Sequence, residues 1–258
     1  MIIYGRNPVR EALRGRRGHG VAEVWATAGV AGEPWLKGVR VRSASAEEVE
    51  RRCGSSAHQG ICAEAGGYPY VSADELLAGE SPLVVALDQV QDPQNLGSIC
   101  RTAECAGAAG VVIAERRAAD VTPAVCKASA GAVEHLRVAR VRNIADFLVD
   151  ARGAGCWCYG ASGATLGGPE GSGGRRGSGS GSGGSGGRVP VPYDAPDYAG
   201  AGVVLVLGSE GEGLRPRVAK ACDELIALPL LGRIESLNVS AAAAALLYEI
   251  LQNRSRPS

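Results

Sequence analysis

Residues 83–114 have the sequence LVVALDQVQDPQNLGSICRTAECAGAAGVVIA. Leu83–Leu87 is a short, continuous apolar run of the kind that buried parallel strands carry. A polar turn follows, and Asp92-Pro93 opens a helix. One face of this helix carries small or apolar residues, namely Leu96, Ile99, Cys100, Ala103 and Gly107. Gly110–Ala114 is a second apolar run, so the order of strand, helix and strand predicts a mostly parallel sheet covered on both faces.

The same alternation continues toward the end of the chain, so we expect one α/β domain over residues 83–258. Further strands are expected at 156–160, 203–207 and 225–228, and helices at 122–131, 143–152 and 238–253. The last helix is the clearest, because its apolar residues recur at the spacing of one helical face. A run of almost only glycine and serine, residues 167–187, buries too little apolar surface to offset its ordering entropy. We expect it to be a flexible surface insertion.

Residues 1–66 predict a smaller α/β domain with the order helix, strand, strand, helix, strand, after a possible first strand at 1–4. Asn7-Pro8 is typical of a helix start, and Ser45 through Glu48 have the pattern of a capping box. Residues 67–82, with their glycines and prolines, are expected to form a linker with one helical turn at Asp74–Leu77.

Composition excludes several classes of protein. Of 258 residues 45% are apolar, so the chain is not disordered, and 27 basic residues balance 27 acidic ones. That balance is not the charge of a general nucleic-acid coat, although a local basic face remains possible. The eight cysteines and three histidines lack zinc-ligand spacing, so we expect reduced cysteines that act as apolar fillers and no metal site. No apolar run reaches the roughly 20 residues of a membrane span, and no signal peptide begins the chain, which predicts a cytoplasmic location.

Three polar clusters follow expected strands, at the sheet edge where α/β proteins bind ligands. They are Asp88–Ala103, Leu207–Leu214 and Leu228–Ser240. Each has a purely structural alternative: Asn95 could cap its helix with Arg101 on the solvated side, Gly208–Gly213 could be a tight turn, and Asn238 or Ser236 could be an ordinary N-cap. The glycine spacing of the second cluster matches neither a dinucleotide fingerprint nor a P-loop.

Taken together, the three clusters resemble the signature motifs of the SpoU family of RNA 2′-O-methyltransferases, within the SPOUT superfamily. The matching residues are Asn95-x-Gly97-x-Ile99-x-Arg101-Thr102, Leu207-Gly208-Ser209-Glu210-Gly211, and Leu228-Pro229 with Ser236-Leu237-Asn238-Val239-Ser240. Ile3–Val9 and His58–Ile61 resemble the family's substrate-binding domain. The resemblance covers nearly the whole chain and is strongest to bacterial enzymes that methylate a guanosine of 23S rRNA. The Gly/Ser segment departs from the common pattern.

The resemblance implies a fold, a methyl donor and an oligomeric state. It implies an α/β catalytic domain with a C-terminal trefoil knot, preceded by a small α/β domain like those of ribosomal proteins. It also implies a homodimer, with S-adenosyl-L-methionine as the cofactor. Mapped onto this sequence, the residues around that cofactor are Leu207, Gly208, Leu228 and Leu237.

The resemblance also implies a set of catalytic residues, with Arg101 in the position of the family's proposed base. A guanidinium is almost always protonated, so we expect Arg101 to contact the ribose-phosphate and hold developing charge, with deprotonation either direct or assisted by phosphate. The residues expected to position it and the nucleotide are Asn95, Glu210, Ser236 and Asn238. Glu210 is the expected partner of the guanidinium.

A basic stripe in the first domain is the candidate for holding RNA. Arg6, Arg10, Arg14 and Arg17 recur at near-helical spacing, which is typical of either a solvated helix face or a set of phosphate contacts. Three alternatives to the main interpretation remain open at this point: a nucleotide-binding α/β protein, a non-catalytic RNA-binding relative, and the same chemistry on tRNA or on an rRNA site that confers antibiotic resistance. Binding of adenosylmethionine against ATP or NAD, and methyl transfer to total RNA, discriminate among them.

Overall fold

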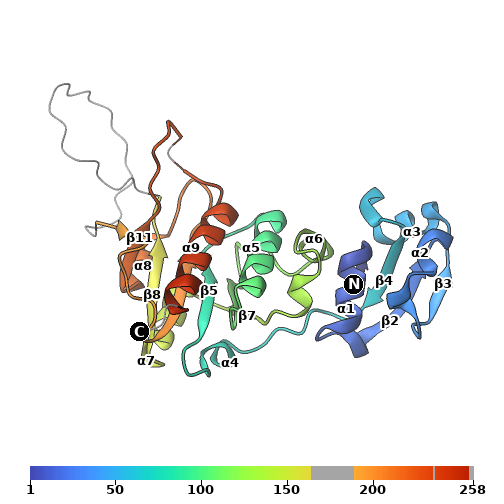
Figure 1. The fold of residues 1–258 in the computed structure, drawn as a ribbon, viewed down its shortest axis with the longest axis horizontal. Coiled ribbons are helices and arrows are strands. Elements are labelled where there is room, and N and C mark those ends of the chain that lie inside the picture. The colour runs from blue at the N-terminus through green and yellow to red at the C-terminus, as the bar shows by residue number, and fades with distance from the viewer. Residues whose placement is uncertain (164–188, 235, 256–258) are drawn as a thin grey trace.

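The computed structural model describes residues 1–163, 189–234 and 236–255, and within them the chain forms two sheets joined by an extended segment (Figure 1). The Gly/Ser segment at 167–187 lies outside the described residues, so its expected flexibility stays a prediction. The expected knot also stays a prediction.

The first sheet has four strands in the order β1-β4-β2-β3. Its strands are β1 (Ile2–Tyr4), β2 (Val21–Ala26), β3 (Val41–Ser43) and β4 (Ile61–Ala65), and its helices are α1 (Arg6–Arg14), α2 (Ala28–Ala31) and α3 (Ala46–Cys53). The predicted order is therefore present, with the single turn α2 in addition. The capping box is confirmed in part, because Ser45 Oγ accepts a hydrogen bond from the Glu48 backbone N–H at 3.2 Å.

The predicted start of α1 at Asn7-Pro8 is wrong. Gly5 is the N-cap and makes no side-chain cap, and the helix begins at Arg6. Gly5 has a φ of 98°, a conformation that glycine adopts without strain, and its N–H donates to the Ile61 carbonyl at 3.1 Å. The chain therefore turns from β1 into the helix earlier than predicted, and Pro8 falls in the first turn, where a missing N–H costs no hydrogen bond.

The second sheet has seven strands in the order β7-β6-β5-β10-β8-β11-β9, and every described pairing in it is parallel. The strands are β5 (Leu83–Leu87), β6 (Gly110–Ala114), β7 (Val138–Val141), β8 (Cys156–Ala161), β9 (Val191–Pro192), β10 (Gly202–Leu207) and β11 (Glu224–Ala227). The predicted mostly parallel α/β sheet is confirmed. The two edge strands, β7 and β9, were not predicted, because each is short and neither carries a continuous apolar run.

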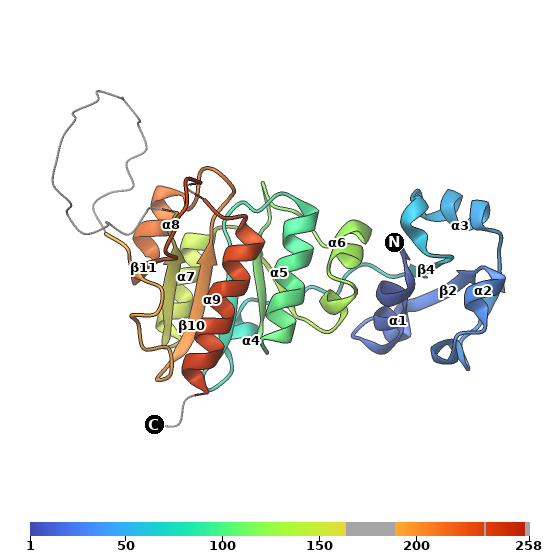
Figure 2. The ribbon, with the colours of Figure 1, turned by 45° about the horizontal axis from the view of Figure 1, so that its top comes forward.

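Helices cover both faces of this sheet (Figure 2). Side chains of α5 (Pro93–Cys105) and α9 (Val239–Arg254) share one buried cluster, with α6 (Pro123–Ala128) packed beside α5. The other face is covered by α4 (Asp74–Leu77), α7 (Ile144–Gly153) and α8 (Pro216–Ala221). The helical turn predicted at 74–77 is confirmed. Gly107 does not belong to the buried face of α5, because the helix ends before it and the residue is exposed.

Gly97 sets the distance between α5 and α6. A Cβ added to this residue would lie 2.4 Å from Ala128 Cβ and 2.9 Å from the Ser129 nitrogen, far inside van der Waals contact. Any larger residue would therefore push the two helices apart. This packing gives a structural reason for the glycine of the first motif, independent of any ligand.

A buried ion pair joins the segment that follows α1 to the segment that precedes β7. Arg17 is 4% exposed and Glu134 is 1% exposed, and Arg17 Nε donates to Glu134 Oε2 at 2.7 Å while Nη2 bonds the other carboxylate oxygen. Arg17 Nη1 also donates to the Gly66 carbonyl at 3.2 Å. The inclusion of Arg17 in a basic surface stripe is therefore wrong: the residue lies beyond the end of α1, and its charge is matched inside the protein.

The cysteines behave as small apolar side chains. Six of the eight are buried and none forms a disulfide. Burial raises the pKa of the Cys62 thiol to about 11 and that of Cys100 to about 12, so both stay protonated and unreactive at neutral pH. In the described part of the chain no helix is long and apolar enough to cross a membrane, and no three His, Cys, Asp or Glu side chains are grouped to hold a metal ion.

Glu134→Gln should lower the free energy of unfolding by about 3–5 kcal/mol, because it leaves the Arg17 guanidinium buried without a counter-charge. Urea denaturation followed by circular dichroism measures this change. The double variant Arg17→Met, Glu134→Leu should recover most of the loss, since it removes both charges together. Glu48→Gln, which breaks the exposed pair with Arg52, is the control and should cost less than about 1 kcal/mol. A loss below about 1 kcal/mol in Glu134→Gln would show that the buried pair contributes little.

Candidate functional site

Two of the predicted motif loops leave the sheet side by side. Strands β5 and β10 pair in register, with Leu87 opposite Leu207, so the loops that follow them start from neighbouring points on the same edge. The Asp88 backbone N–H donates to the Leu207 carbonyl at 2.8 Å and continues the ladder by one bond. Residues far apart in the sequence therefore meet at the carboxyl edge of the sheet, as the strand order predicted.

A buried aspartate fastens these two loops together. Asp88 is fully buried, and its carboxylate accepts hydrogen bonds from Arg215 Nε at 2.7 Å and from the Arg215 backbone N–H at 2.9 Å. Arg215 Nη2 lies 2.7 Å from the same carboxylate. Both guanidinium nitrogens contact Asp88 Oδ1, and the backbone N–H takes Oδ2, so these charge-assisted contacts occupy both carboxylate oxygens. This clamp fixes where the loop of 208–214 stands relative to the first loop.

The first motif places Asn95 inside α5, not at its cap. Asp92 is the N-cap and accepts a hydrogen bond from the Gln94 backbone N–H at 3.0 Å, with Pro93 as the first helical residue. The alternative that Asn95 caps the helix is therefore wrong. Because Asp92 caps the helix, the Asn95 side chain, which is 7% exposed, is free to bond other partners.

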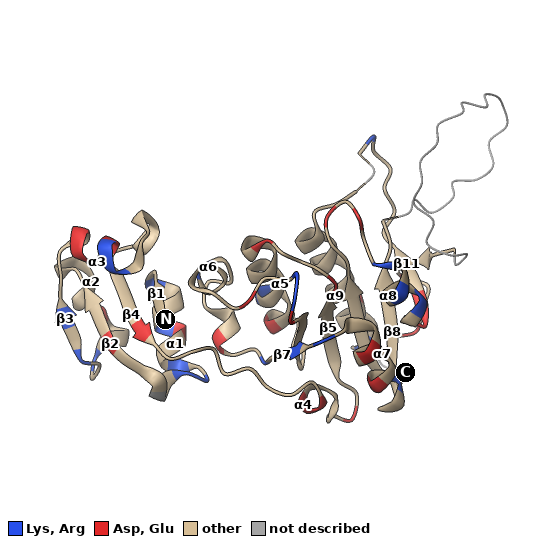
Figure 3. Cartoon of the chain, turned by 180° about the vertical axis from the view of Figure 1, so that it is seen from behind, with Lys and Arg blue, Asp and Glu red and all other residues tan. Residues whose placement is uncertain are grey.

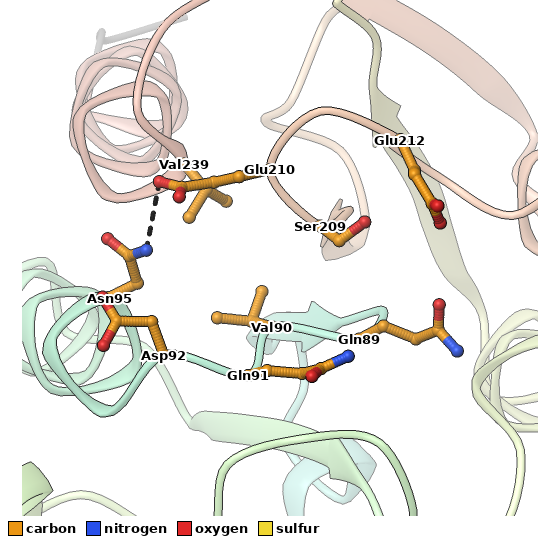
Figure 4. A pocket seen from close by; sticks show the side chains of 9 residues that line it. All are labelled: Gln89, Val90, Gln91, Asp92, Asn95, Ser209, Glu210, Glu212 and Val239. Atoms are coloured by element: carbon orange, nitrogen blue, oxygen red, sulfur yellow. Dashed lines mark hydrogen bonds between the residues drawn. The ribbon is translucent and has the colours of Figure 1, made fainter.

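One carboxylate oxygen gathers the three motifs. Glu210 Oε1, from the second motif, accepts a hydrogen bond from Asn95 Nδ2 at 3.1 Å (Figure 4). The same oxygen accepts a second hydrogen bond from Asn238 Nδ2 at 2.6 Å. Asn238 Nδ2 also donates to Asn95 Oδ1 at 3.0 Å. Asn238 is at the same time the N-cap of α9, through Oδ1 and the Ser240 backbone N–H at 2.9 Å. Asn238 therefore has two roles: its Oδ1 caps α9, and its Nδ2 bonds the residues of the site.

Two amide donors and two helix ends surround the Glu210 carboxylate. Helices α5 and α9 pack against each other, and both begin at this edge of the sheet, next to Glu210. The amino end of a helix carries partial positive charge, and the two asparagine amides donate to the carboxylate directly. Glu210 is thus held as a fixed acceptor with one oxygen, Oε2, that makes no hydrogen bond in the described chain.

A pocket of about 350 Å³ opens beside the cluster. Side chains from both loops face it (Figure 4): it is lined by Gln89, Val90, Gln91, Asp92, Asn95, Ser209, Glu210, Glu212 and Val239. Among the described residues, no cationic side chain lines it. The side chains of Gln89, Gln91, Ser209 and Glu212 make no hydrogen bond within the described residues, so polar groups remain for a ligand rich in hydrogen-bond donors.

The glycine-rich turn of the second motif is closed by its own backbone. Ser209 and Gly213 exchange hydrogen bonds at 3.1 and 3.0 Å. A Cβ on Gly208 would lie 2.1 Å from the Gly213 carbonyl carbon, which the fold does not allow. The turn therefore needs glycine at 208, and it presents backbone groups close to the end of β10.

Arg101 does not join the cluster within one chain. It is exposed on α5, six residues after Asn95, which on a regular helix is about 9 Å along the axis and on another face. In the described residues it has no ion pair, and Glu210 contacts the two asparagines instead of a guanidinium. The expected Arg101–Glu210 partnership is therefore wrong for the single chain. The 42% exposed Arg215, paired with Asp88, is the arginine that this edge holds in place.

The remaining predicted residues lie around the same edge with different exposures. Leu207 and Gly208 are buried, Leu228 is half-buried, and Ser236 and Leu237 are exposed in the segment that leads to α9. In α1, Arg6 pairs with Glu33 at 3.1 Å and Arg10 with Glu11 at 2.7 Å, while Arg14 is exposed without a partner in the described chain. The predicted basic stripe is thus partly neutralised by neighbouring carboxylates.

Sequence reasoning missed the Asp88–Arg215 clamp and the strain next to it. Asp88 follows a buried strand directly, and that position is a usable signal for a polar residue at the sheet edge. Nothing in the spacing of 127 residues points to Arg215 as its partner. Gln89, with a φ of 65°, occupies the left-handed region that side chains rarely adopt, and this becomes visible only in the fold.

Known proteins share both the sequence and the fold of this chain. It is 38% identical over 202 residues to a TrmH family tRNA/rRNA methyltransferase, YacO, of Bacillus subtilis, covering 76% of this chain and 71% of that protein. It is 34% identical to a tRNA/rRNA methyltransferase, slr0955, of Synechocystis, covering 98% of this chain and 62% of that protein. The crystal structure of an AdoMet-bound rRNA methyltransferase from Sinorhizobium meliloti superposes with a TM-score of 0.73 at 25% identity, covering 97% of this chain and 86% of that one.

Family models divide the chain in the same way as its two sheets. The model described as RNA 2′-O ribose methyltransferase substrate binding matches residues 2–71, which contain the four-stranded sheet. The model of the SpoU rRNA methylase family matches residues 82–248, which contain the seven-stranded sheet, both asparagines and Glu210. With most of its length matched and its three motifs joined at one edge of the sheet, the chain belongs to the SpoU rRNA methylase family.

Proposed function

We propose that this chain transfers a methyl group from S-adenosyl-L-methionine to a ribose 2′-hydroxyl of RNA, and that its target is a guanosine of 23S rRNA. One observation carries the proposal: the hydrogen-bonded cluster of Asn95, Glu210 and Asn238, which unites all three motifs beside an open pocket. The AdoMet-bound state of a relative that shares the fold supports the choice of donor. An RNA substrate of this kind fits a cytoplasmic location.

The residues around the sheet edge fit such a donor. S-adenosyl-L-methionine supplies an electrophilic methyl group on a positively charged sulfonium. The carboxylates of Glu210 and Glu212 face a pocket without cations and therefore favour a positively charged ligand. The closed turn at Gly208 offers backbone groups at close range, and the 49% exposed Leu237 offers apolar surface for a purine. We propose Leu207, Gly208, Leu228 and Leu237 as the donor-binding set.

The chain must then hold the sugar hydroxyl in line with the methyl group and stabilise charge on its oxygen. Glu210 Oε2 and the pocket's amide side chains are placed to accept and orient hydroxyl groups. The Arg101 guanidinium would contact the ribose-phosphate and hold the developing negative charge. We propose Asn95, Ser236 and Asn238 as positioning residues, since Asn95 lies in the first turn of α5 and the other two lie at the start of α9.

A homodimer would bring Arg101 to the site that its own chain leaves incomplete. Leu231 is 97% exposed and Ile234 is 75% exposed, and both lie in the segment that leads from β11 to α9. Apolar side chains exposed so close together favour burial against another surface. We therefore propose that two copies associate through this region and that Arg101 acts on the site of its partner.

We also propose residues 1–66 as the domain that captures RNA, with Arg6, Arg10 and Arg14 as phosphate contacts.

Transfer to ribose has a distinctive chemical readout. In vitro transcribed 23S rRNA and tritiated donor should give labelled RNA whose alkaline hydrolysis leaves the label in alkali-stable dinucleotides, because a methylated 2′-oxygen cannot attack the adjacent phosphate. Label that is released in mononucleotides would indicate methylation of a base and contradict the proposal. The same assay on transcribed tRNA separates the two RNA classes.

Arg101→Ala should reduce kcat by at least about 100-fold, because the variant loses the cation that stabilises the developing charge. Donor affinity, measured by calorimetry, should change by less than about three-fold, since Arg101 lies outside the proposed donor-binding set. Arg101→Lys keeps the charge and serves as the matched variant. Turnover of Arg101→Ala near that of the wild type would remove Arg101 from the mechanism.

Gly208→Ala should weaken donor binding by at least about 100-fold, because the added methyl group would overlap the Gly213 backbone and open the turn. Calorimetric titration with S-adenosyl-L-methionine measures the loss. The control is Gly200→Ala, at an exposed position where nothing lies within 4 Å of the added Cβ. Unchanged affinity in Gly208→Ala would separate this turn from the donor.

Mixed dimers test where Arg101 acts. An Arg101→Ala copy and a Glu210→Ala copy, co-expressed with different tags and purified through both, should regain about half the wild-type kcat if Arg101 serves the partner's site. In that case one of the two sites has both residues. If each chain completes its own site, the mixed dimer stays as inactive as either parent.

A further inference from the structure

Three arginines stand at the carboxyl edge of the sheet without a counter-charge. Arg116 and Arg117 follow β6, and Arg142 follows β7. All three are exposed, and none makes a hydrogen bond or an ion pair within the described residues. The two strands are paired, and the Glu115 backbone N–H donates to the Val141 carbonyl at 2.9 Å, so the arginines project from neighbouring points of one edge. We call these three residues the arginine rim.

The rim is attached to the wall of the pocket. The Ala119 backbone N–H donates to the Val90 carbonyl at 2.9 Å, and Val90 lines the pocket. The loop that carries Arg116 and Arg117 therefore runs directly beside the segment 89–92, which lines the pocket. Arg117 has a φ of 57° and Gln89 a φ of 65°, so each of these two joined loops contains a residue with a side chain in the left-handed region. Such strain is concentrated at ligand-binding sites.

Neighbouring charges separate the rim from the rest of this surface. Arg140, also on β7, pairs with Asp120 at 3.7 Å and lies over the Tyr70 ring, with its guanidinium carbon 5.1 Å from the ring centroid. Arg140 and Asp120 therefore bind each other and Tyr70, and neither neutralises an arginine of the rim. Only the exposed Glu115 adjoins the rim in sequence, which leaves a local positive surplus in a chain of zero formal net charge. Figure 3 shows basic segments between α5 and β7.

The pocket and the rim have opposite charge. Asp92, Glu210 and Glu212 line the pocket, which has no cationic side chain. A ribose or base can enter it, but the phosphates on either side of that nucleotide would be repelled by the carboxylates. They need cations just outside the pocket. Adjacent strands lie about 4.8 Å apart, so long arginine side chains in the segments that follow β6 and β7 can reach successive phosphates of one RNA strand.

We propose that the arginine rim binds the phosphodiester backbone of the substrate RNA next to the target nucleotide, and so aligns that nucleotide with the pocket. This inference rests on the proposed function for its ligand. It adds a second place of RNA contact, on the catalytic unit, to the one in residues 1–66. The guanidinium groups would recognise phosphate rather than base, so the rim would contribute affinity and register but little sequence preference.

The test is the salt dependence of RNA binding by the full chain, with Arg116, Arg117 and Arg142 all changed to Ala. Binding of a fluorescein-labelled stem–loop RNA is followed by anisotropy across a range of KCl concentrations. Each lost phosphate contact should lower the slope of log affinity against log salt by about 0.7 to 0.9, so the loss of three contacts should lower it by about 2.1 to 2.7. In methyl transfer to transcribed 23S rRNA, its KM for RNA should rise roughly ten-fold or more while kcat stays within about two-fold.

Two controls accompany the triple variant. The triple Lys variant keeps the charges and should retain the wild-type slope. Lys220→Ala removes one exposed, unpaired cation from α8, on the other side of the sheet, and should also leave slope and KM unchanged. Thermal unfolding should be the same for all variants, because the exposed rim makes no hydrogen bond or ion pair with the described residues.

The outcomes distinguish the two proposals. A triple Ala variant with wild-type slope and KM overturns the rim while leaving methyl transfer intact. A wild-type chain that binds RNA but methylates none of it overturns the proposed function, and the slope then still decides whether the rim binds phosphate. A loss of slope in the Lys220→Ala control equal to the loss per rim residue would reduce the rim to general surface charge and overturn it.

Discussion

A single oxygen atom, Glu210 Oε1, holds the site together. It accepts hydrogen bonds from Asn95 and Asn238, residues that begin or lie near the beginning of two different helices, so the positions of α5, α9 and the second-motif loop depend on one acceptor. The parallel sheet makes this possible, because the carboxyl ends of β5 and β10 are adjacent and send both loops over the same edge. The Asp88–Arg215 pair fixes the position of the loop that carries Glu210 relative to the end of β5. A carboxylate placed in this way needs no movement to act as an acceptor, which is the preorganisation that efficient catalysis requires.

Most of the fold could be predicted from the sequence, for identifiable reasons. The apolar runs of β5 and β6 are continuous because both of their faces are buried, and the predicted bounds of these two strands match the structure. The edge strands β7 and β9 could not be found in this way, because Arg140 interrupts the apolar residues of β7 and β9 has only two residues. The start of α1 was predicted from a common capping signal, but Gly5 supplied a turn that no periodicity reveals. The burial of Arg17 depends on a carboxylate 117 residues away, a distance over which sequence patterns carry no information.

The same distinction applies to the site. The motif residues could be placed at one edge from strand order alone, and Asn95, Glu210 and Asn238 do meet there. Which side chain bonds which partner could not be derived, because it depends on loop paths and on which residue caps each helix. Asp92 takes the cap of α5 and so leaves Asn95 available, whereas Asn238 fills both roles. Arg101 lies on a different helical face from Asn95. The six-residue spacing predicts this separation, but a match to the motif alone does not indicate it.

The buried pair of Arg17 and Glu134 has a consequence for how such a protein can be recombined. Because Arg17 belongs to the amino-terminal unit and Glu134 to the catalytic unit, each unit carries one buried charge that is destabilising without its partner. A chimera that takes its amino-terminal unit from a relative must therefore import the matching acid or base as well, or replace both by apolar residues. Although the chain looks modular, one residue of each unit, Arg17 and Glu134, restricts which units can be exchanged between relatives.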